Sequence, residues 1–347
     1  MNNPFSLSFG TCPEELVDRP VQTNEILQSF RADPVNQRTY MITGVRGSGK
    51  TVLMTEISNR LKQDKSWTVI PLSPEGDMIH ALAAKLSSIR KYSELFRDAR
   101  INLSFLGLGL EIDGEPPVTD DETAIVRMLE SIKKKAGRVL ITVDEVTNNE
   151  NVRKFAAVYQ ILIREDLPLF LLMTGLYENI YDLQNERSLT FLYRAPKVQL
   201  QPLNMKAISD AYRNILRIDE STGVEMAKLT RGYAFAFQVL GFFTFQEKDH
   251  DYRKAMSRYR LYLDEYVYEK LWSELSGKDR EIVRCMAVRK TNLVSEIKKH
   301  SGIGNNDFST YRLRLIRKGI VDGSTRGILV FTLPLFEEFV RDQILFS

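Results

Sequence analysis

The hydrophobic pattern of the first half of the chain alternates short apolar runs with helical stretches. Four runs have the length of strands; they lie at residues 39–43, 67–72, 139–143 and 169–173. The last two are bounded by Gly, Pro or charged residues. A helical pattern at 50–63 separates the first two, and a fifth short run follows at 197–200. Continuous apolar runs are typical of parallel strands. The alternation predicts an α/β fold, with a mostly parallel sheet and helices on both faces.

Residues 99–117 interrupt this alternation. Two apolar stretches there flank Leu106-Gly107, which predicts a small inserted hairpin. The next helix is expected to begin at Thr119, because a Thr with Glu122 three residues later can form a capping box.

The second half of the chain is helical until near its end. Helices are expected at 205–216, 222–230, 233–247 and 254–275, the third almost wholly apolar and therefore buried. Three short helices and a strand pair around Asp322-Gly323 and 328–333 should follow. This is the order of a winged helix-turn-helix.

Composition indicates an ordinary folded protein. The 347 residues are 43% hydrophobic and 27% charged, which argues against disorder and allows two or three domains. Cys12 and Cys285 are too far apart to begin a disulfide framework, and we take Cys285 as a core residue. No signal peptide or membrane span is recognisable in the sequence, so we expect a cytoplasmic protein.

Residues 44–51 satisfy the phosphate-loop pattern GxxxxGK[ST] between a predicted strand and a predicted helix. Three glycines, Gly44, Gly47 and Gly49, permit the backbone to turn its amides inward around a polyphosphate. Lys50 would reach the β and γ phosphates, and Thr51 would ligate Mg²⁺. A chance match in a glycine-rich turn is the alternative. The other expected nucleotide-binding positions are Val45, Arg46, Ser48 and Val52.

Two carboxylates end the run at 139–143, as metal-assisted phosphoryl transfer requires. Asp144 would hold Mg²⁺ through water, and Glu145 would activate the attacking water. Thr174 follows the next apolar run and is expected to bring a hydroxyl beside them, unless it merely starts a turn with Gly175. Arg187 and Arg194 are the candidates for the arginine that neutralises transition-state charge, and the sequence does not choose between them.

Five segments carry a resemblance to a known family: GVRGSGKTVL, ITVDEV, MTG, RLRLIRKGI and VFTLPLFEEF. The chain from Glu15 to Phe339 resembles the AAA+ ATPases of the origin-recognition and archaeal-ATPase branch. The resemblance implies an ATPase domain at 1–200, a helical lid at 201–253, and a winged-helix domain with a leading linker helix at 254–347. It also implies adenine nucleotide as ligand, water activation by the Asp-Glu pair, and a sensor 1 role for Thr174.

The lid departs from that family. Many initiator-type relatives carry a sensor 2 Arg where this chain has Ala234 and Phe235, and signalling relatives carry GxP. Arg231, one residue outside the matching stretch, is the candidate substitute. We expect slow ATP hydrolysis, or a nucleotide switch that hydrolyses rarely.

The excess positive charge lies at the C-terminus. The whole chain has a net charge of +3, whereas residues 276–347 contain 13 Lys or Arg and 8 Asp or Glu. On the second helix of the helix-turn-helix, at 305–318, Arg312 falls within the apolar arc and should snorkel or pair. The candidates for contacts with duplex DNA are Arg314, Arg317, Lys318 and Arg326. Protein docking or self-docking is the alternative use of the same surface.

Two functions remain open from the sequence. The first is an ATP-binding, Mg²⁺-dependent ATPase whose nucleotide state positions the winged helix, with duplex DNA as a candidate partner. The second is a nucleotide-gated signalling or protein-interaction switch with little turnover and no DNA binding. Self-association that supplies an arginine finger in trans is compatible with the first, and no membrane partner is expected.

Overall fold

The structure is a computed structural model that describes residues 2–8, 15–98 and 120–345. The hairpin expected at 99–117, the cap expected at Thr119 and Cys12 lie outside these residues. Contacts divide the chain into two compact units. The sheet unit comprises Pro20–Thr43 and Lys50–Gln199, and the helical unit comprises Met1–Arg19, Gly44–Gly49 and Leu200–Ser347.

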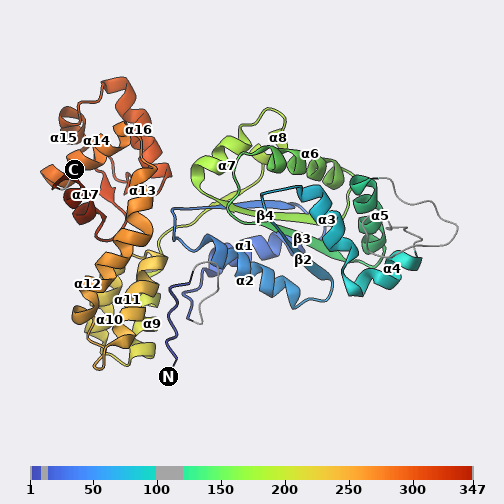
Figure 1. The fold of residues 1–347 in the computed structure, drawn as a ribbon, viewed down its shortest axis with the longest axis horizontal. Helices are drawn as coiled ribbons and strands as arrows, with labels where there is room; N and C mark the ends of the chain where they lie inside the picture. The colour runs from blue at the N-terminus through green and yellow to red at the C-terminus, as the bar shows by residue number, and fades with distance from the viewer. Residues whose placement is uncertain (1, 9–14, 99–119, 346–347) are drawn as a thin grey trace. The chain divides into compact units, whose positions relative to one another are not determined.

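Five parallel strands form the centre of the sheet unit (Figure 1). They are β1 (Thr39–Thr43), β2 (Trp67–Leu72), β3 (Arg138–Val143), β4 (Leu169–Gly175) and β5 (Lys197–Gln199). Their order is β2-β3-β4-β1-β5, so β4 lies between β1 and β3. The parallel α/β fold expected from the apolar runs is confirmed. Because all strands are parallel, their carboxyl ends share one edge of the sheet.

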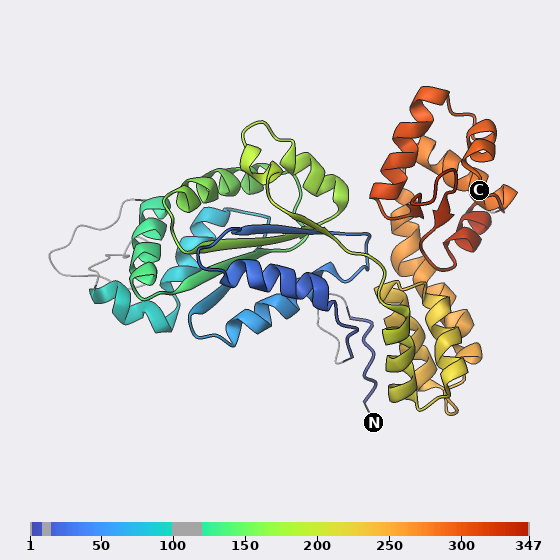
Figure 2. The same cartoon turned by 180° about the vertical axis from the view of Figure 1, so that it is seen from behind.

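Helices cover both faces of this sheet (Figure 2). They are α1 (Pro20–Arg31), α2 (Lys50–Lys62), α3 (Met78–Ser87), the 3-10 turn η1 (Arg90–Tyr92), α4 (Ser93–Asp98), α5 (Asp121–Lys134), α6 (Glu150–Arg164), α7 (Tyr177–Gln184) and α8 (Thr190–Tyr193). On one face Phe30 of α1 packs against Tyr40, Trp67 and Phe170. On the other face α3, α5 and α6 share an apolar cluster with strand residues such as Ile141. Alternate strand residues therefore face opposite layers.

The helix after the undescribed segment begins at an aspartate cap. Its N-cap is Asp120, which accepts hydrogen bonds from the Thr123 amide and hydroxyl, both at 2.8 Å. An aspartate is at least as good an N-cap as a threonine and adds negative charge at the positive end of the helix. The four residues 119–122 were expected to open this helix, and the described ones among them do so, with Asp120 as the N-cap.

The helical unit contains the rest of the described helices and a strand pair. Its elements are α9 (Met205–Leu216), α10 (Glu220–Thr230), α11 (Ala234–Gln246), α12 (Tyr252–Leu263), the π-helical turn η3 (Asp264–Tyr268), α13 (Glu269–Ser273), α14 (Gly277–Arg289), α15 (Val294–His300), α16 (Asn305–Arg317), β6 (Val321–Asp322), β7 (Val330–Phe331) and α17 (Phe336–Leu345). The single helix expected at 254–275 is interrupted by η3. Strands β6 and β7 pair antiparallel. The succession from α14 to β7 keeps the order expected of a winged helix, and that interpretation stays a prediction.

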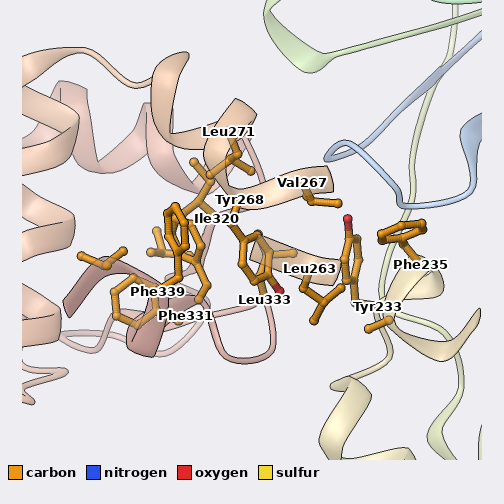
Figure 3. Close-up of a cluster of buried hydrophobic side chains, with 14 of the residues drawn as sticks. Tyr233, Phe235, Leu263, Val267, Tyr268, Leu271, Ile320, Phe331, Leu333 and Phe339 are labelled. Carbon is orange, nitrogen blue, oxygen red and sulfur yellow. The ribbon is translucent and has the colours of Figure 1, made fainter. Parts of the chain in front are cut away.

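One apolar core extends through the helical unit, from α9 to α17. Figure 3 shows part of it, with Tyr233 and Phe235 near Leu263 and Val267, and Tyr268 near Phe339. Cys285 belongs to this core, as expected.

Candidate functional site

The carboxyl ends of β3 and β4 bring Asp144 and Thr174 together. Val143 pairs with Met173 in register, so the next residue of each strand lies at the same level of the sheet edge. The fully buried Thr174 donates its hydroxyl hydrogen to Asp144 Oδ1. The structure thus places the Thr174 hydroxyl against the Asp144 carboxylate, and the role of Thr174 stays a prediction.

The first turn of α2 reaches the same carboxylate. Lys50 is the first residue of this helix, and Thr51 Oγ1 donates to Asp144 Oδ2 at 2.8 Å. Both oxygens of Asp144 are therefore held by a threonine hydroxyl, one from α2 and one from β4. A hydroxyl beside a carboxylate at a helix start is the donor set that Mg²⁺ takes in phosphate-loop enzymes. Val52, the next residue, is half-buried.

Glu145 is exposed and has an uncommon backbone conformation. Its φ is 53°, in the left-handed region that residues other than glycine rarely adopt. Its amide is shared between Asp144 Oδ1 at 3.1 Å and Thr174 Oγ1 at 3.2 Å, which holds the backbone in place. Residues in such conformations cluster at functional sites. Because Glu145 is exposed, its carboxylate is accessible to water.

The phosphate loop itself, residues 44–49, is a tight turn in the helical unit. Gly47 has φ 73° and Gly49 has φ 92°, conformations that a residue with a Cβ adopts only under strain. The Ser48 amide donates to Val45 O at 3.1 Å and closes the turn. Ser48 Oγ is buried and has no hydrogen-bond partner within the described chain. A buried hydroxyl of this kind fits a site that receives a polar ligand.

Side chains from distant parts of the helical unit contact this loop. Tyr233 Oη donates to Arg46 O at 2.7 Å, and Arg19 Nη2 donates to Ser48 O at 3.1 Å. The Arg46 guanidinium pairs with Glu274 at 3.3 Å. Sequence analysis missed Arg19 and Tyr233 as loop partners. The sequence carries no local signal for them, because their partners lie 29 and 187 residues away.

The two arginine-finger candidates and Arg231, the candidate substitute for a sensor 2 arginine, lie in different surroundings. Arg187 and Arg194 are exposed in the segment around α8 of the sheet unit. Arg231, which follows α10, donates to Phe331 O at 2.9 Å and to Leu333 O at 3.5 Å. Its guanidinium is thus engaged by the segment around β7.

The four basic residues considered for DNA binding also differ from one another. Arg314 binds the fully buried Asp279 through its Nε at 3.0 Å and its Nη2 at 2.5 Å. Arg314 therefore anchors α16 to α14. This contact differs from the predicted outward position, in which Arg314 would contact DNA. Lys318 Nζ donates to Glu274 O at 3.3 Å, Arg317 is half-buried, and Arg326 is exposed near the β6–β7 turn.

Residues 16–164 match the family described as an ATPase domain predominantly from Archaea. The resemblance of this part of the chain to archaeal ATPases is confirmed. Residues 265–340 match a domain of unknown function. No protein of curated function matches the sequence significantly.

Two solved structures are similar over nearly the whole chain. A Walker-type ATPase from Pyrococcus abyssi has a TM-score of 0.69 at 18% identity, with 97% of this chain and 99% of that chain covered. The ORC2 protein of Aeropyrum pernix, solved as ADPNP and ADP complexes, has a TM-score of 0.60 at 13% identity, with 97% and 98% covered. These similarities show a P-loop NTPase-like fold, which the chain shares with both proteins. Within the described ranges, the helices are too short or too polar to cross a membrane.

Proposed function

We propose that this protein binds adenine nucleotide with Mg²⁺ and hydrolyses ATP slowly in the cytoplasm. The observation that carries this proposal is the contact between Thr51 and Asp144, which joins the first turn after the phosphate loop to the carboxylate that follows β3. A loop with the required glycine conformations directly precedes this turn in the chain.

The residues present fit a nucleotide and its metal. Gly47 and Gly49 give the loop its turn, and the partnerless Ser48 hydroxyl is available to a polar ligand. Lys50 and Thr51 follow in the chain, so Lys50 would neutralise phosphate charge, while Thr51 and Asp144 would hold Mg²⁺, the latter through water. Bound Mg²⁺ supplies charge neutralisation on the phosphate oxygens.

The remaining groups supply the attack by water. Glu145 would orient the nucleophilic water and accept its proton, since its carboxylate is exposed beside Asp144. Thr174 holds the Asp144 carboxylate and the Glu145 amide, which fixes the position of the general base. This arrangement supports a sensor 1 role for Thr174, whose hydroxyl donates to the Asp144 carboxylate and accepts from the Glu145 amide.

We expect slow turnover because no arginine of the lid helix is available to neutralise charge on the γ-phosphate. The lid helix α11 begins with Ala234 and Phe235 and brings no arginine, and Arg231 is bound to backbone carbonyls. Arg187 or Arg194 is then left to serve a neighbouring copy as an arginine finger in trans, because both are exposed. A nucleotide-gated switch with little turnover is the second candidate, favoured by the same lack of a lid arginine.

The rate of ATP hydrolysis by the Glu145→Gln variant distinguishes the ATPase from the nucleotide-gated switch. The ATPase proposal expects turnover to fall by at least about 100-fold while the affinity for MgATP stays near that of the wild type. Glu165→Gln, an exposed acid at the end of α6, is the matched control and should hydrolyse normally. Equally slow turnover in wild type and Glu145→Gln supports the switch.

We also propose that α16 and the β6–β7 turn bind duplex DNA as part of a winged helix. Arg317, Lys318 and Arg326 are the proposed phosphate contacts, and Arg314 is left out because it holds Asp279. The double change Arg317→Ala and Arg326→Ala should weaken duplex binding at low salt and flatten its salt dependence. The control is Lys206→Ala with Lys248→Ala, which removes two exposed charges from elsewhere in the helical unit. Equal affinity of both double variants argues for protein docking instead.

A further inference from the structure

Three consecutive carbonyls of the phosphate loop accept hydrogen bonds from residues far away in the sequence. Arg46 O accepts from Tyr233 Oη at 2.7 Å, and Gly47 O accepts from the Phe235 amide at 3.1 Å. Ser48 O accepts from Arg19 Nη2 at 3.1 Å. All these residues belong to the helical unit. The outer side of the loop is therefore held at each of its central peptides.

The direction of these carbonyls determines the direction of the amides that bind phosphate. In a trans peptide the carbonyl and the following N–H point in opposite directions. Holding the carbonyls of Arg46 and Ser48 therefore turns the amides of Gly47 and Gly49 away from the donors. Inward-facing amides are what a polyphosphate requires of such a loop.

The donors keep their protons; Tyr233 and Phe235 are buried, and Arg19 is half-buried. Tyr233 is 5% exposed, and burial raises the pKa of its phenol far above the usual range, so it stays a donor at any working pH. Burial lowers the pKa of Arg19 to about 10, which leaves it cationic at neutral pH, and its Nη1 also donates to Gln201 O at 2.6 Å. The Phe235 amide belongs to the first turn of α11, where amides have no partner within the helix.

The approach of Tyr233 to the loop is unusually close. A Cβ added to Gly47 would lie 2.2 Å from Tyr233 Oη and 3.0 Å from Phe235 Cβ. Figure 3 shows Tyr233 and Phe235 side by side at the start of α11. The position of Gly47 thus depends on these two aromatic residues as well as on its own backbone freedom.

We infer that Tyr233 and Arg19 are positioning residues for phosphate binding, which hold the loop carbonyls outward and keep its amides ready for a nucleoside di- or triphosphate. This inference rests on the proposed nucleotide binding and adds the residues that organise it. Tyr233 lies at the start of the helix that would carry a sensor 2 arginine, but it acts on the loop rather than on the phosphate.

Tyr233→Phe tests the inference because it removes one hydroxyl. The loss of this bond should weaken MgADP and MgATP alike by roughly 2- to 10-fold, and raise KM without lowering kcat. Tyr259→Phe is the matched control, since Tyr259 Oη donates to Leu229 O at 3.0 Å in the same unit and is equally buried. It should leave nucleotide affinity unchanged, while both variants lose similar thermal stability. Arg19→Gln should weaken both nucleotides as Tyr233→Phe does.

Hydrogen exchange in the nucleotide-free protein supplies a second readout. The peptide covering residues 44–52 should exchange faster in Tyr233→Phe than in wild type or Tyr259→Phe. If Tyr233→Phe and Tyr259→Phe have equal nucleotide affinities and equal exchange rates at residues 44–52, the inference is wrong. The proposed function still holds in that case if Lys50→Ala loses nucleotide binding. If the wild type binds no nucleotide, the proposed function fails, and the exchange rates still decide whether Tyr233 holds the loop.

Discussion

Two features of the structure favour glycine at position 47, where the side chain is only a hydrogen atom. Its φ of 73° favours glycine, and Tyr233 Oη occupies the space that a side chain would need. The first feature concerns the backbone alone, and the second concerns the contact between the loop and α11. A substitution can separate them, because another glycine of the chain has the first property without the second.

Gly47→Ala is expected to weaken MgATP binding by about 10-fold or more, since strain and overlap add. Gly76→Ala is the control: Gly76 has φ 78°, and an added Cβ meets nothing within 4 Å. It should cost about 1 kcal/mol of stability and leave nucleotide affinity unchanged. Calorimetric titration and thermal unfolding measure the two effects; equal affinities in both variants would show that the Tyr233 contact is unimportant.

Arg314 shows why a predicted basic face is not a binding surface until partners are known. Helical spacing places it away from the apolar arc, but spacing does not reveal Asp279, which lies 35 residues away and is fully buried. Asp279 also completes the capping box with Ser276 at the start of α14. The ion pair between Arg314 and Asp279 therefore joins α16 to the start of α14.

Arg314→Met should destabilise the fold by about 3 kcal/mol, because it leaves the buried Asp279 carboxylate without its charged partner. The double variant Arg314→Met with Asp279→Asn should recover part of this loss. Arg326→Ala, at an exposed position, should change the free energy of unfolding by less than about 0.5 kcal/mol. Denaturant titration measures all three, and equal values for Arg314→Met and Arg326→Ala would contradict the role of the pair.

At the scale of elements, the sequence predicted the sheet better than the helices around it. Buried parallel strands are continuous apolar runs, so all five were predicted nearly at their observed ends. Helices α1, α3 and α6 were not identified individually, although Pro20 at the first position of α1 and the Asn149 cap of α6 are recognisable start signals. The π turn η3 could not be predicted, because it depends on how the helices at its two ends pack.

Local sequence patterns also determine which site residues could be predicted. Lys50, Thr51 and Asp144 were predicted because loop and strand ends are local patterns whose meeting follows from a parallel sheet. Tyr233 and Arg19 were not, since a tyrosine or arginine that donates to a backbone carbonyl needs no particular residue at the other end. Contacts between a side chain and a distant backbone carbonyl therefore cannot be predicted from residue types alone.

The η3 turn carries a pH dependence. Burial is the largest cause that raises the pKa of Asp264 to about 6; Asp342 and Glu269 add to the rise, while Arg260 opposes it. The fold therefore favours protonated Asp264, and this stabilisation is lost as pH rises from about 4 through 6. Asp264→Asn should gain stability relative to wild type between pH 4 and 7, by about 1 kcal/mol after solvent screening. Thermal unfolding across this range measures the change. Glu265→Gln, at the exposed neighbour, should show no such trend; a parallel trend in both variants would contradict the assignment to Asp264.

At the scale of the whole molecule, the phosphate loop and the carboxylates belong to different units. Gly44–Gly49 groups with the helical unit, while Lys50 and Asp144 group with the sheet unit. Under the proposed function, efficient turnover would require an arginine from a second copy, because helix α11 contains none.

Mixing two inactive variants tests this requirement. Arg187→Ala with Arg194→Ala keeps the phosphate site but lacks the finger, whereas Lys50→Ala keeps the finger but lacks phosphate binding. Each should hydrolyse ATP poorly alone, and their mixture should regain part of the wild-type rate. A mixture no faster than its components would contradict an arginine finger in trans.

The central claim is that the loop before Lys50 binds a nucleotide whose metal is held by Thr51 and Asp144. Isothermal titration of protein freed of carried-over ligand tests it most directly. With MgATP and MgADP the wild type should give saturable heat at one site per chain, which Lys50→Ala abolishes. Absence of heat with either nucleotide in the wild type, or equal heat in Lys50→Ala, would contradict the account.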